Sequence, residues 1–385
     1  MRFNKRFGWM LGICGIVMAM LLASCGGSGG GSNTVLQGTT KSVVLDGGQV
    51  TPAGVATAAA GQGFVTVDES SGRITGSVTV TFGTTGTGAH IHAGAAGTDG
   101  PVLVDLVQSS PGVWVVPENV VLTQSQVAAF ESGQLYIMIE SSAHPNGEIR
   151  GQIGRMVFFA TLTGAQEVPP TGSAATGVGM WVFDPVTKVI SGTETVTGMT
   201  ATVSHFHQGA VGVVAPVAIP FTGGPTTWTL PPTTLTDDQV TALLSGGFYA
   251  NAHSVKNPGG EIRGQVYLPT KCAALTGLQE TPPNNSAATA TGCAGVNPFT
   301  KAVASRIETQ GIDGTLAHIH QGPPGVVSPV IVPMSQVSPG IWVSGANAAF
   351  TDAQLNAFIT GGTYLNVHSA ALPVGEIRGQ LVNGQ

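Results

Sequence analysis

The chain contains one sequence pattern three times, and this repetition constrains its fold more than any other feature of its 385 residues. A His-x-His sequence begins a thirteen-residue block in each copy, and the blocks align without a gap: HIHAGAAGTDGPV, HFHQGAVGVVAPV and HIHQGPPGVVSPV. A tryptophan follows each block, and Gly-Glu-Ile-Arg-Gly-Gln comes near the end of each copy. Internal repetition of this kind predicts three copies of one structural unit.

The N-terminus has the pattern of an export signal. Residues 1–24 combine a basic start with an apolar run too short for a comfortable membrane span. They lead into Leu22-Ala23-Ser24-Cys25, which resembles the lipobox of bacterial lipoproteins; the resemblance implies cleavage before Cys25 and lipid attachment to its thiol. Residues 25–39 then read as a Gly/Ser tether. We therefore expect an exported protein anchored by lipid to the cell envelope, at the outer membrane or cell surface.

The charge of the mature chain excludes one class of partner. Cleavage removes three of the 14 Lys and Arg residues and none of the 20 Asp and Glu residues, so the net charge becomes 11 minus 20, or −9, with His neutral. Nucleic-acid binding calls for clustered Lys and Arg, so we expect no nucleic-acid partner.

The three copies have the size and pattern of small β-domains. We expect them at residues 40–154, 155–269 and 270–385, each large enough to bury one core. Short alternating or apolar runs lie between Gly, Ser and Asn clusters and predict strands. Each copy also has a Thr followed three residues later by Gln, then apolar residues at helical spacing and a Gly, which predicts a short capped helix. The predicted fold class is all-β, with three tandem β-sandwich or barrel-like domains that each carry one short capped helix.

Two cysteines remain outside the leader and the lipidation site. Aligning the copies places Cys272 and Cys293 opposite the apolar residues Phe159 and Met180 of the second copy. In an exported protein this exchange predicts a disulfide between adjacent strands.

The histidines are the main candidates for chemistry. Residues i and i+2 of a strand point to the same face, so His-x-His sets two imidazoles side by side. A third histidine ends a Tyr-x-Asn-x-His segment in the second and third copies, and three neutral imidazoles with an open fourth position suit zinc or copper. The candidate ligands are His205, His207 and His253 in the second copy and His318, His320 and His368 in the third.

The first copy departs from this pattern. It keeps His90 and His92, but Glu140 stands where the other copies have the third histidine, and His144 lies four residues further on. Either Glu140 replaces an imidazole with a carboxylate, or the first site is degenerate. We favour degeneracy or an altered affinity.

A second interpretation of the histidines stays open, in which each imidazole belongs to a buried hydrogen-bond network with Tyr, Asn or Glu. The Glu and Arg of the terminal motif are expected to have structural roles, with both charges held by neighbours. The tryptophans are expected to be core residues. The residues with these expected structural roles are Glu148, Arg150, Glu261, Arg263, Glu376, Arg378, Trp114, Trp228 and Trp342.

The ordered motifs His-Ile-His-x-Gly, Gly-x-Trp, Leu-Thr-x-x-Gln, Tyr-x-Asn-x-His and Gly-Glu-Ile-Arg-Gly-Gln resemble the CHRD domain, named for chordin. The resemblance covers nearly all of residues 40–385. It implies a β-sandwich-like domain of extracellular and microbial exported proteins without established catalytic activity. The growth-factor partner of chordin does not transfer to a lipoprotein of this kind. Glu140, Met138 and Phe206 depart from the motifs.

These observations favour a non-enzymatic lipoprotein, anchored to the membrane, whose tandem domains bind an unknown protein or envelope partner. The alternative is an envelope protein that binds copper or zinc through the histidines. An enzyme with a three-histidine metal centre is the third hypothesis. No cofactor is required by the sequence, and copper and zinc are the candidates.

Overall fold

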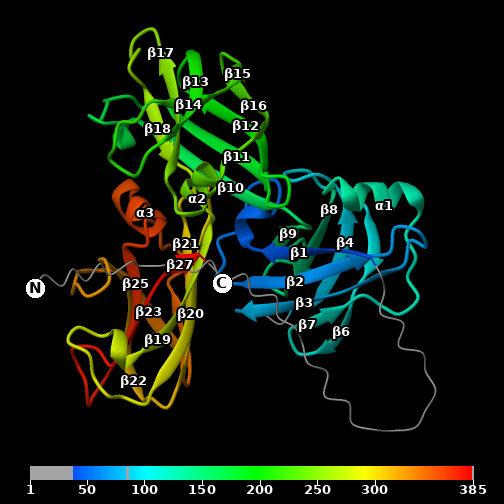
Figure 1. Ribbon diagram of the computed structural model, residues 1–385. Coiled ribbons are helices and arrows are strands. Elements are labelled where there is room, and N and C mark those ends of the chain that lie inside the picture. Colours follow the sequence, from blue (N-terminus) through cyan, green and yellow to red (C-terminus); the bar gives the residue numbers. More distant parts are fainter. Residues whose placement is uncertain (1–37, 84–85, 384–385) are drawn as a thin grey trace, which may run out of the picture. The chain divides into compact units, whose positions relative to one another are not determined.

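The same strand order occurs three times in the computed structural model, which describes residues 38–83 and 86–383 (Figure 1). The export signal, Cys25 and most of the tether lie outside the described residues. Within the described part of the chain, no helix has the length and apolar character needed to cross a membrane.

Domain 1 consists of a five-stranded and a four-stranded antiparallel sheet. A single β-bridge between Asp46 and Arg150 links the two. In spatial order the first sheet contains β1 (Thr39–Leu45), β2 (Ala60–Val67), β3 (Ile74–Phe82), β7 (Val113–Val115) and β6 (Val107–Ser110). The second contains β5 (Val102–Asp105), β4 (Gly88–Ala93), β8 (Leu135–Glu140) and β9 (Ile149–Gln152).

Domain 2 has the same order in one nine-stranded sheet. The strands are β14 (Val217–Pro220), β13 (Ala201–Gln208), β17 (Phe248–Ser254), β18 (Ile262–Gln265), β10 (Met156–Thr163), β11 (Thr176–Asp184), β12 (Val189–Thr197), β16 (Thr227–Thr234) and β15 (Thr222–Gly223).

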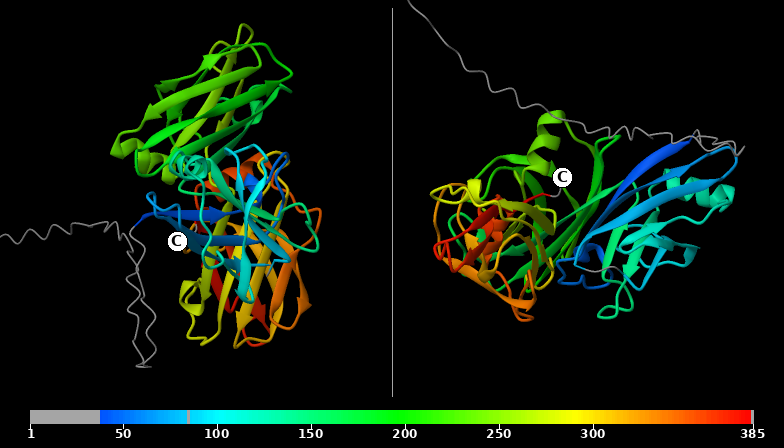
Figure 2. Two further views of the ribbon diagram at one scale, coloured as in Figure 1. Left: turned by 90° about the vertical axis from the view of Figure 1, so that its right-hand side faces the viewer. Right: turned by 90° about the horizontal axis from the view of Figure 1, so that it is seen from below.

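Domain 3 closes its sheet, because β19 pairs with β20 as well as with β26. The strands are β20 (Thr289–Val296), β21 (Val303–Gln310), β24 (Ile341–Ser344), β23 (Val330–Ser338), β22 (Gly314–Gln321), β25 (Thr363–Ser369), β26 (Ile377–Gln380), β19 (Thr270–Thr276) and β27 (Val382–Asn383). The view from below shows these strands, in yellow to red, arranged around a common interior (Figure 2). The expected all-β class with three barrel-like domains is therefore confirmed.

Each domain has one α-helix of eight residues, and each begins as predicted. The Thr before the helix accepts the N–H of a Gln, and the Gln side chain accepts the N–H of the Thr, which is a complete capping box. A Gly with positive φ ends each helix. The helices are α1 (Gln124–Glu131), α2 (Asp237–Leu244) and α3 (Asp352–Ile359); the 3-10 turns are η1 (Gly47–Gln49), η2 (Gly164–Gln166) and η3 (Gly277–Gln279).

Three apolar clusters, one for the most part in each domain, contain the buried Trp114, Trp228 and Trp342. The core of domain 2 contains a carboxyl group: Glu194 is 0% exposed, and its Oε1 accepts a hydrogen bond from Ser204 at 2.9 Å.

Apolar residues take the place of Glu194 in the other domains. Glu194 lies opposite Trp228 on the neighbouring strand, where Val78 and Ile307 lie opposite the tryptophans of domains 1 and 3. Burial raises the pKa of Glu194 to about 7.

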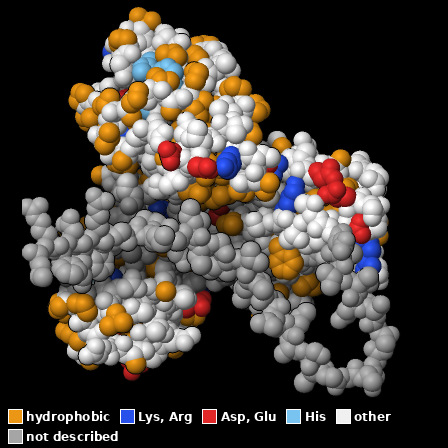
Figure 3. Space-filling model, viewed as in Figure 1, with side chains coloured by type: hydrophobic (Ala, Val, Ile, Leu, Met, Phe, Trp, Pro, Cys, Tyr) orange, Lys and Arg blue, Asp and Glu red, His pale blue; other side chains and the backbone are white. Residues whose placement is uncertain are grey.

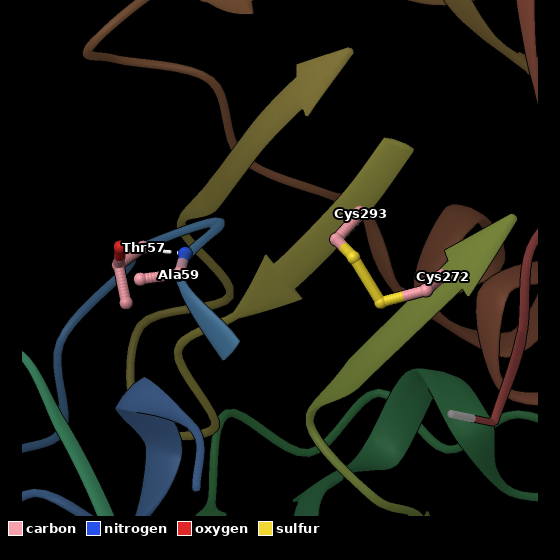
Figure 4. Close-up of a disulfide and its surroundings, with 4 residues drawn as sticks. All are labelled: Thr57, Ala59, Cys272 and Cys293. Atoms are coloured by element: carbon pink, nitrogen blue, oxygen red, sulfur yellow. Dashed lines mark hydrogen bonds between the residues drawn. A yellow bond between two sulfur atoms is a disulfide. The ribbon is translucent and has the colours of Figure 1, made fainter. Parts of the chain in front are cut away.

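The two cysteines of domain 3 lie directly opposite each other on β19 and β20. A disulfide joins Cys272 to Cys293, and Figure 4 shows it bridging the two neighbouring strands. The bond closes a sequence separation of 21 residues.

Candidate metal centres

The ligands predicted in domain 2 lie on two hydrogen-bonded strands, β13 and β17. His205 is paired with Asn251, His207 with Tyr249, and His253 with Val203. Residues that lie opposite each other in an antiparallel pair point to the same face. The Tyr-x-Asn-x-His segment therefore meets His-x-His as its neighbour within one sheet. Strands β22 and β25 repeat this register in domain 3.

The three imidazoles of each domain converge. One ring nitrogen from each of His205, His207 and His253 lies within 4.8 Å of the other two, and the same holds for His318, His320 and His368. The two His-x-His pairs have equal ring separations of 5.5 Å and are nearly perpendicular, at 85° and 87°. We call these two sets the triads.

One nitrogen of each triad imidazole is buried without a hydrogen-bond partner among the described residues. Buried polar atoms in folded proteins are ordinarily hydrogen-bonded, so three orphaned nitrogens at one place need an explanation. A bound metal ion would satisfy all three. The atoms are Nδ1 of His205, Nε2 of His207 and Nε2 of His253, and the matching Nδ1 of His318, Nε2 of His320 and Nε2 of His368.

Backbone carbonyl groups hold the other nitrogen of two imidazoles in each triad. Nδ1 of His207 donates to the carbonyl oxygen of Ala215 at 2.8 Å, and Nδ1 of His253 donates to that of Pro258 at 3.0 Å. A carbonyl oxygen only accepts, so the proton must be on Nδ1 and the lone pair of Nε2 is free. The triad of domain 3 has the same bonds, at 2.7 Å and 3.0 Å.

The surroundings favour the neutral form of the two His-x-His imidazoles in each triad. Burial, followed by the neighbouring histidines, lowers the pKa of His205 to about 4, and the same causes lower the pKa of His318 to about 4. Burial also lowers the pKa of His207 and of His320. Neutral imidazoles are the form that binds a metal ion, so no proton need leave these groups at pH 7.

A tyrosine and an arginine stack on the second histidine of each triad. The rings of His207 and Tyr249 are parallel to within 2°, with centroids 4.7 Å apart, and the guanidinium of Arg263 lies 3.4 Å from the Tyr249 centroid. We call this the Arg–Tyr–His stack. It recurs in domain 3 as Arg378, Tyr364 and His320, and in domain 1 as Arg150, Tyr136 and His92.

The terminal Gly-Glu-Ile-Arg-Gly-Gln motif holds the loop that orients this histidine. Arg263 donates to the carbonyl oxygens of Val213 and Ala210 at 2.9 and 3.0 Å, and Gln265 donates to that of Gly209 at 2.8 Å. The hydroxyl of Tyr249 accepts the N–H of Ala215 at 3.0 Å. Arg263 and Gln265 thus hold in place the loop whose Ala215 carbonyl group keeps the proton of His207 on Nδ1. The motif recurs with every His-x-His pair, and this recurrence was a signal that the two are linked. The sequence alone led us to expect only a structural role for the motif.

The glutamates of the motif are held by hydroxyl groups, so the expected satisfaction by neighbours applies to each charge separately. Glu148 accepts from Thr57 at 2.6 Å, Glu261 from Ser173 at 2.6 Å, and Glu376 from Ser286 at 2.6 Å.

The hydrogen-bond-network interpretation does not describe the triads. Asn251 donates to Glu167 and to the carbonyl oxygen of Ile262, and Tyr249 stacks on His207 by its ring face. Among the described residues, the triad imidazoles donate to backbone carbonyl oxygens, and no hydrogen bond links one of them to Tyr, Asn or Glu.

Domain 1 has a different arrangement. Nδ1 of His90 lies 2.9 Å from Oε1 of Glu140, and its Nε2 lies 3.5 Å from Asp105. His92 keeps the pattern of His207: its Nδ1 is 3.0 Å from the carbonyl oxygen of Gly100, and its Nε2 is buried without a partner. His144 lies in the turn after β8, where its N–H donates to Ser141. Among described residues, only domains 2 and 3 bring three such donors within 4.8 Å.

The triad of domain 2 reaches the surface. Histidine side chains are visible over β13 and β17, with hydrophobic side chains around them (Figure 3). The imidazoles of this triad are therefore partly exposed, although their three unpartnered nitrogens are buried.

The fold and these sites define a class: an all-β protein of three repeated barrel-like domains, each presenting a His-x-His strand. The model of the CHRD domain matches residues 41–153, 158–266 and 272–381, so the chain belongs to the CHRD domain family, with three tandem copies. A comparison with curated proteins gave no match.

Proposed function

We propose that this chain is a non-enzymatic, exported protein of the cell envelope that binds one copper or zinc ion in each of domains 2 and 3. The observation that carries the proposal is the occurrence, twice, of three buried and unpartnered imidazole nitrogens within 4.8 Å of one another. Copper and zinc both accept imidazole ligands in sets of three.

Binding is favoured over catalysis because of the residues that surround each triad. The groups that the structure places against the domain 2 triad are the stacked ring of Tyr249, two backbone carbonyl groups, and Asn251, Pro220 and Val203 on the paired strands. None of these is a general base or a nucleophile of the kind that metal-dependent hydrolysis uses.

The location of the protein is part of the proposal and depends on the sequence alone. The lipobox-like segment before Cys25 and the Gly/Ser tether support a lipid anchor that holds the domains near a membrane surface, within reach of an envelope partner. Intact-mass analysis of the mature protein from its host tests the anchor. A mature chain that starts at Cys25 with added lipid mass is expected, and an unacylated Cys25 would overturn the anchoring.

Metal content tests the binding sites. The mature full-length chain is loaded anaerobically with Cu(I), desalted and measured by elemental analysis, with two ions per chain expected. His318→Ala/His320→Ala should lower the content to one ion, and combining it with His205→Ala/His207→Ala should lower it to none. His144→Ala is the matched control, because this histidine lies outside both triads. A Cu(I) content that stays the same in folded double variants would contradict the proposal.

A further inference from the structure

In domain 1, Glu140 stands at the position of the third histidine, and its carboxylate lies beside the His-x-His pair. Glu140 is paired with Gly88 on the neighbouring strand, as His253 is paired with Val203. Its Oε1 lies 2.9 Å from Nδ1 of His90, the nitrogen whose counterpart in His205 belongs to the triad. The two atoms form a hydrogen bond in this structure. Two ligands that are each about 2.0–2.1 Å from one tetrahedral zinc ion lie about 3.3 Å apart, so a cation between these atoms needs them to separate by only a few tenths of an ångström.

A second change in domain 1 accommodates this carboxylate. A Cβ atom on Gly88 would overlap Oε2 of Glu140. The residues that match Gly88 are Val203 in domain 2 and Leu316 in domain 3, each opposite a histidine. Glycine and glutamate thus occur together on paired positions, and the missing Cβ leaves the space that the Glu140 carboxylate occupies here.

The rest of the site is retained in domain 1. The rings of His90 and His92 are 5.8 Å apart at 89°, close to the 5.5 Å and 85° of His205 and His207. The Arg–Tyr–His stack on His92 is present, with a ring separation of 4.8 Å. Nε2 of His92 remains buried and without a hydrogen-bond partner.

A second carboxylate adds negative charge at the rim. Asp105 lies opposite His90 on β5, where proline stands in the other two domains. Its side chain is 83% exposed and lies 3.5 Å from Nε2 of His90. Two added carboxylates change the site from one of neutral nitrogen atoms to one that favours harder divalent cations.

We propose that domain 1 holds a metal site of a different class, formed by His90, His92 and Glu140, that takes a divalent cation such as Zn²⁺ and discriminates against Cu(I). The inference rests on the proposed metal-binding function of the triads. The donors of this site are not all within 4.8 Å of one another, so His92 and Glu140 must close on the ion as it binds. We therefore expect weaker binding than at the triads.

Zn²⁺ and Cu(I) contents of the full-length mature chain test this inference. The wild-type chain should bind three Zn²⁺ at saturation but two Cu(I). Glu140→Gln, which keeps the shape of the side chain, should lower Zn²⁺ to two and leave Cu(I) at two. Gly88→Val/Glu140→His, which copies domain 2, should raise Cu(I) from two to three.

Two outcomes separate this inference from the proposed function. A wild-type chain that binds only two Zn²⁺, both retained in Glu140→Gln, would overturn the inference while leaving the triads intact. Loss of one Zn²⁺ in Glu140→Gln, with no loss in the histidine variants of domains 2 and 3, would support the site in domain 1 and overturn the triads. The Zn²⁺ content of the wild-type chain, three ions or two, tests the inference even if a variant fails to fold.

Discussion

Removal of the stacked arginine in domain 3 should weaken metal binding at a site that it does not touch. Arg378 is 2% exposed, donates to the carbonyl oxygens of Val326 and Pro323 at 2.9 and 2.8 Å, and lies 3.4 Å from the ring centroid of Tyr364. Tyr364 in turn stacks on His320, whose Nδ1 donates to Ser328 in the same loop. Arg378→Met should therefore leave both this loop and the metal ligand His320 less firmly held.

The magnitude follows from these contacts. Two hydrogen bonds from a charged donor contribute about 1.5–3 kcal/mol each, and the cation–π contact contributes about 1–2 kcal/mol. Burial lowers the pKa of Arg378, which shows that the cation also costs free energy to bury. We expect a net loss of about 3 kcal/mol in the stability of domain 3. Loss of an outer contact of this kind lowers metal affinity by roughly 10–100-fold.

The assay is competition for Cu(I) against a chromophoric chelator, in a His205→Ala/His207→Ala background so that only the domain 3 triad remains. Arg378→Lys should fall between wild type and Arg378→Met, because an ammonium cannot donate as a planar fork. Arg306→Met is the control, since that residue donates to Glu308 on the surface of the same domain. An unchanged Kd in folded Arg378→Met would refute the reasoning.

Three further predictions concern stability. Because burial raises the pKa of Glu194 from 4.5 to about 7, the folded state binds the proton more tightly, and the free energy of unfolding of domain 2 should fall by about 3 kcal/mol as the pH rises from 4.5 to 7. Glu194→Gln should abolish this pH dependence in hydrogen-exchange mass spectrometry, with domain 3 as the internal reference. An unchanged dependence would exclude Glu194 as its source. Cys272→Ala/Cys293→Ala should destabilise domain 3 by about 3 kcal/mol through the 21-residue separation, and urea denaturation with no shift would argue against this. Thr351→Ala should cost about 1 kcal/mol by removing the cap of α3, measured as a lower thermal midpoint, whereas Thr360→Ala at the other end of the helix should cost less.

Several parts of the site follow from periodicity and alignment. The alternation of strand residues predicts that His205 and His207 share a face, and counting back from the terminal motif identifies Glu140 as the altered position in domain 1. The capping boxes follow from local chemistry alone, since donor and acceptor are three residues apart.

Other parts depend on contacts between distant segments, which local patterns do not contain. The pairing of β13 with β17 decides whether the third imidazole reaches the first two, and those strands are separated by the whole of β14 to α2. The roles of Arg263 and Gln265 depend on loop carbonyl groups that are 50 and 56 residues away in the sequence. Glu194 shares a face of β12 with the buried Val196, but a carboxylate is seldom fully buried, so its burial is established only when β12 is placed against β16.

The carbonyl groups that hold the proton of the second histidine on Nδ1 have a consequence for how the three copies can differ in sequence. They belong to Gly100, Ala215 and Ser328, which are three different residues at the same offset from the histidine. A backbone acceptor survives almost any side-chain exchange, so the contact that determines the tautomer leaves no trace in residue identity. Across the three domains this position varies while the arginine that holds its loop stays the same, so a comparison of residue identities reveals the arginine and misses the carbonyl group that it positions.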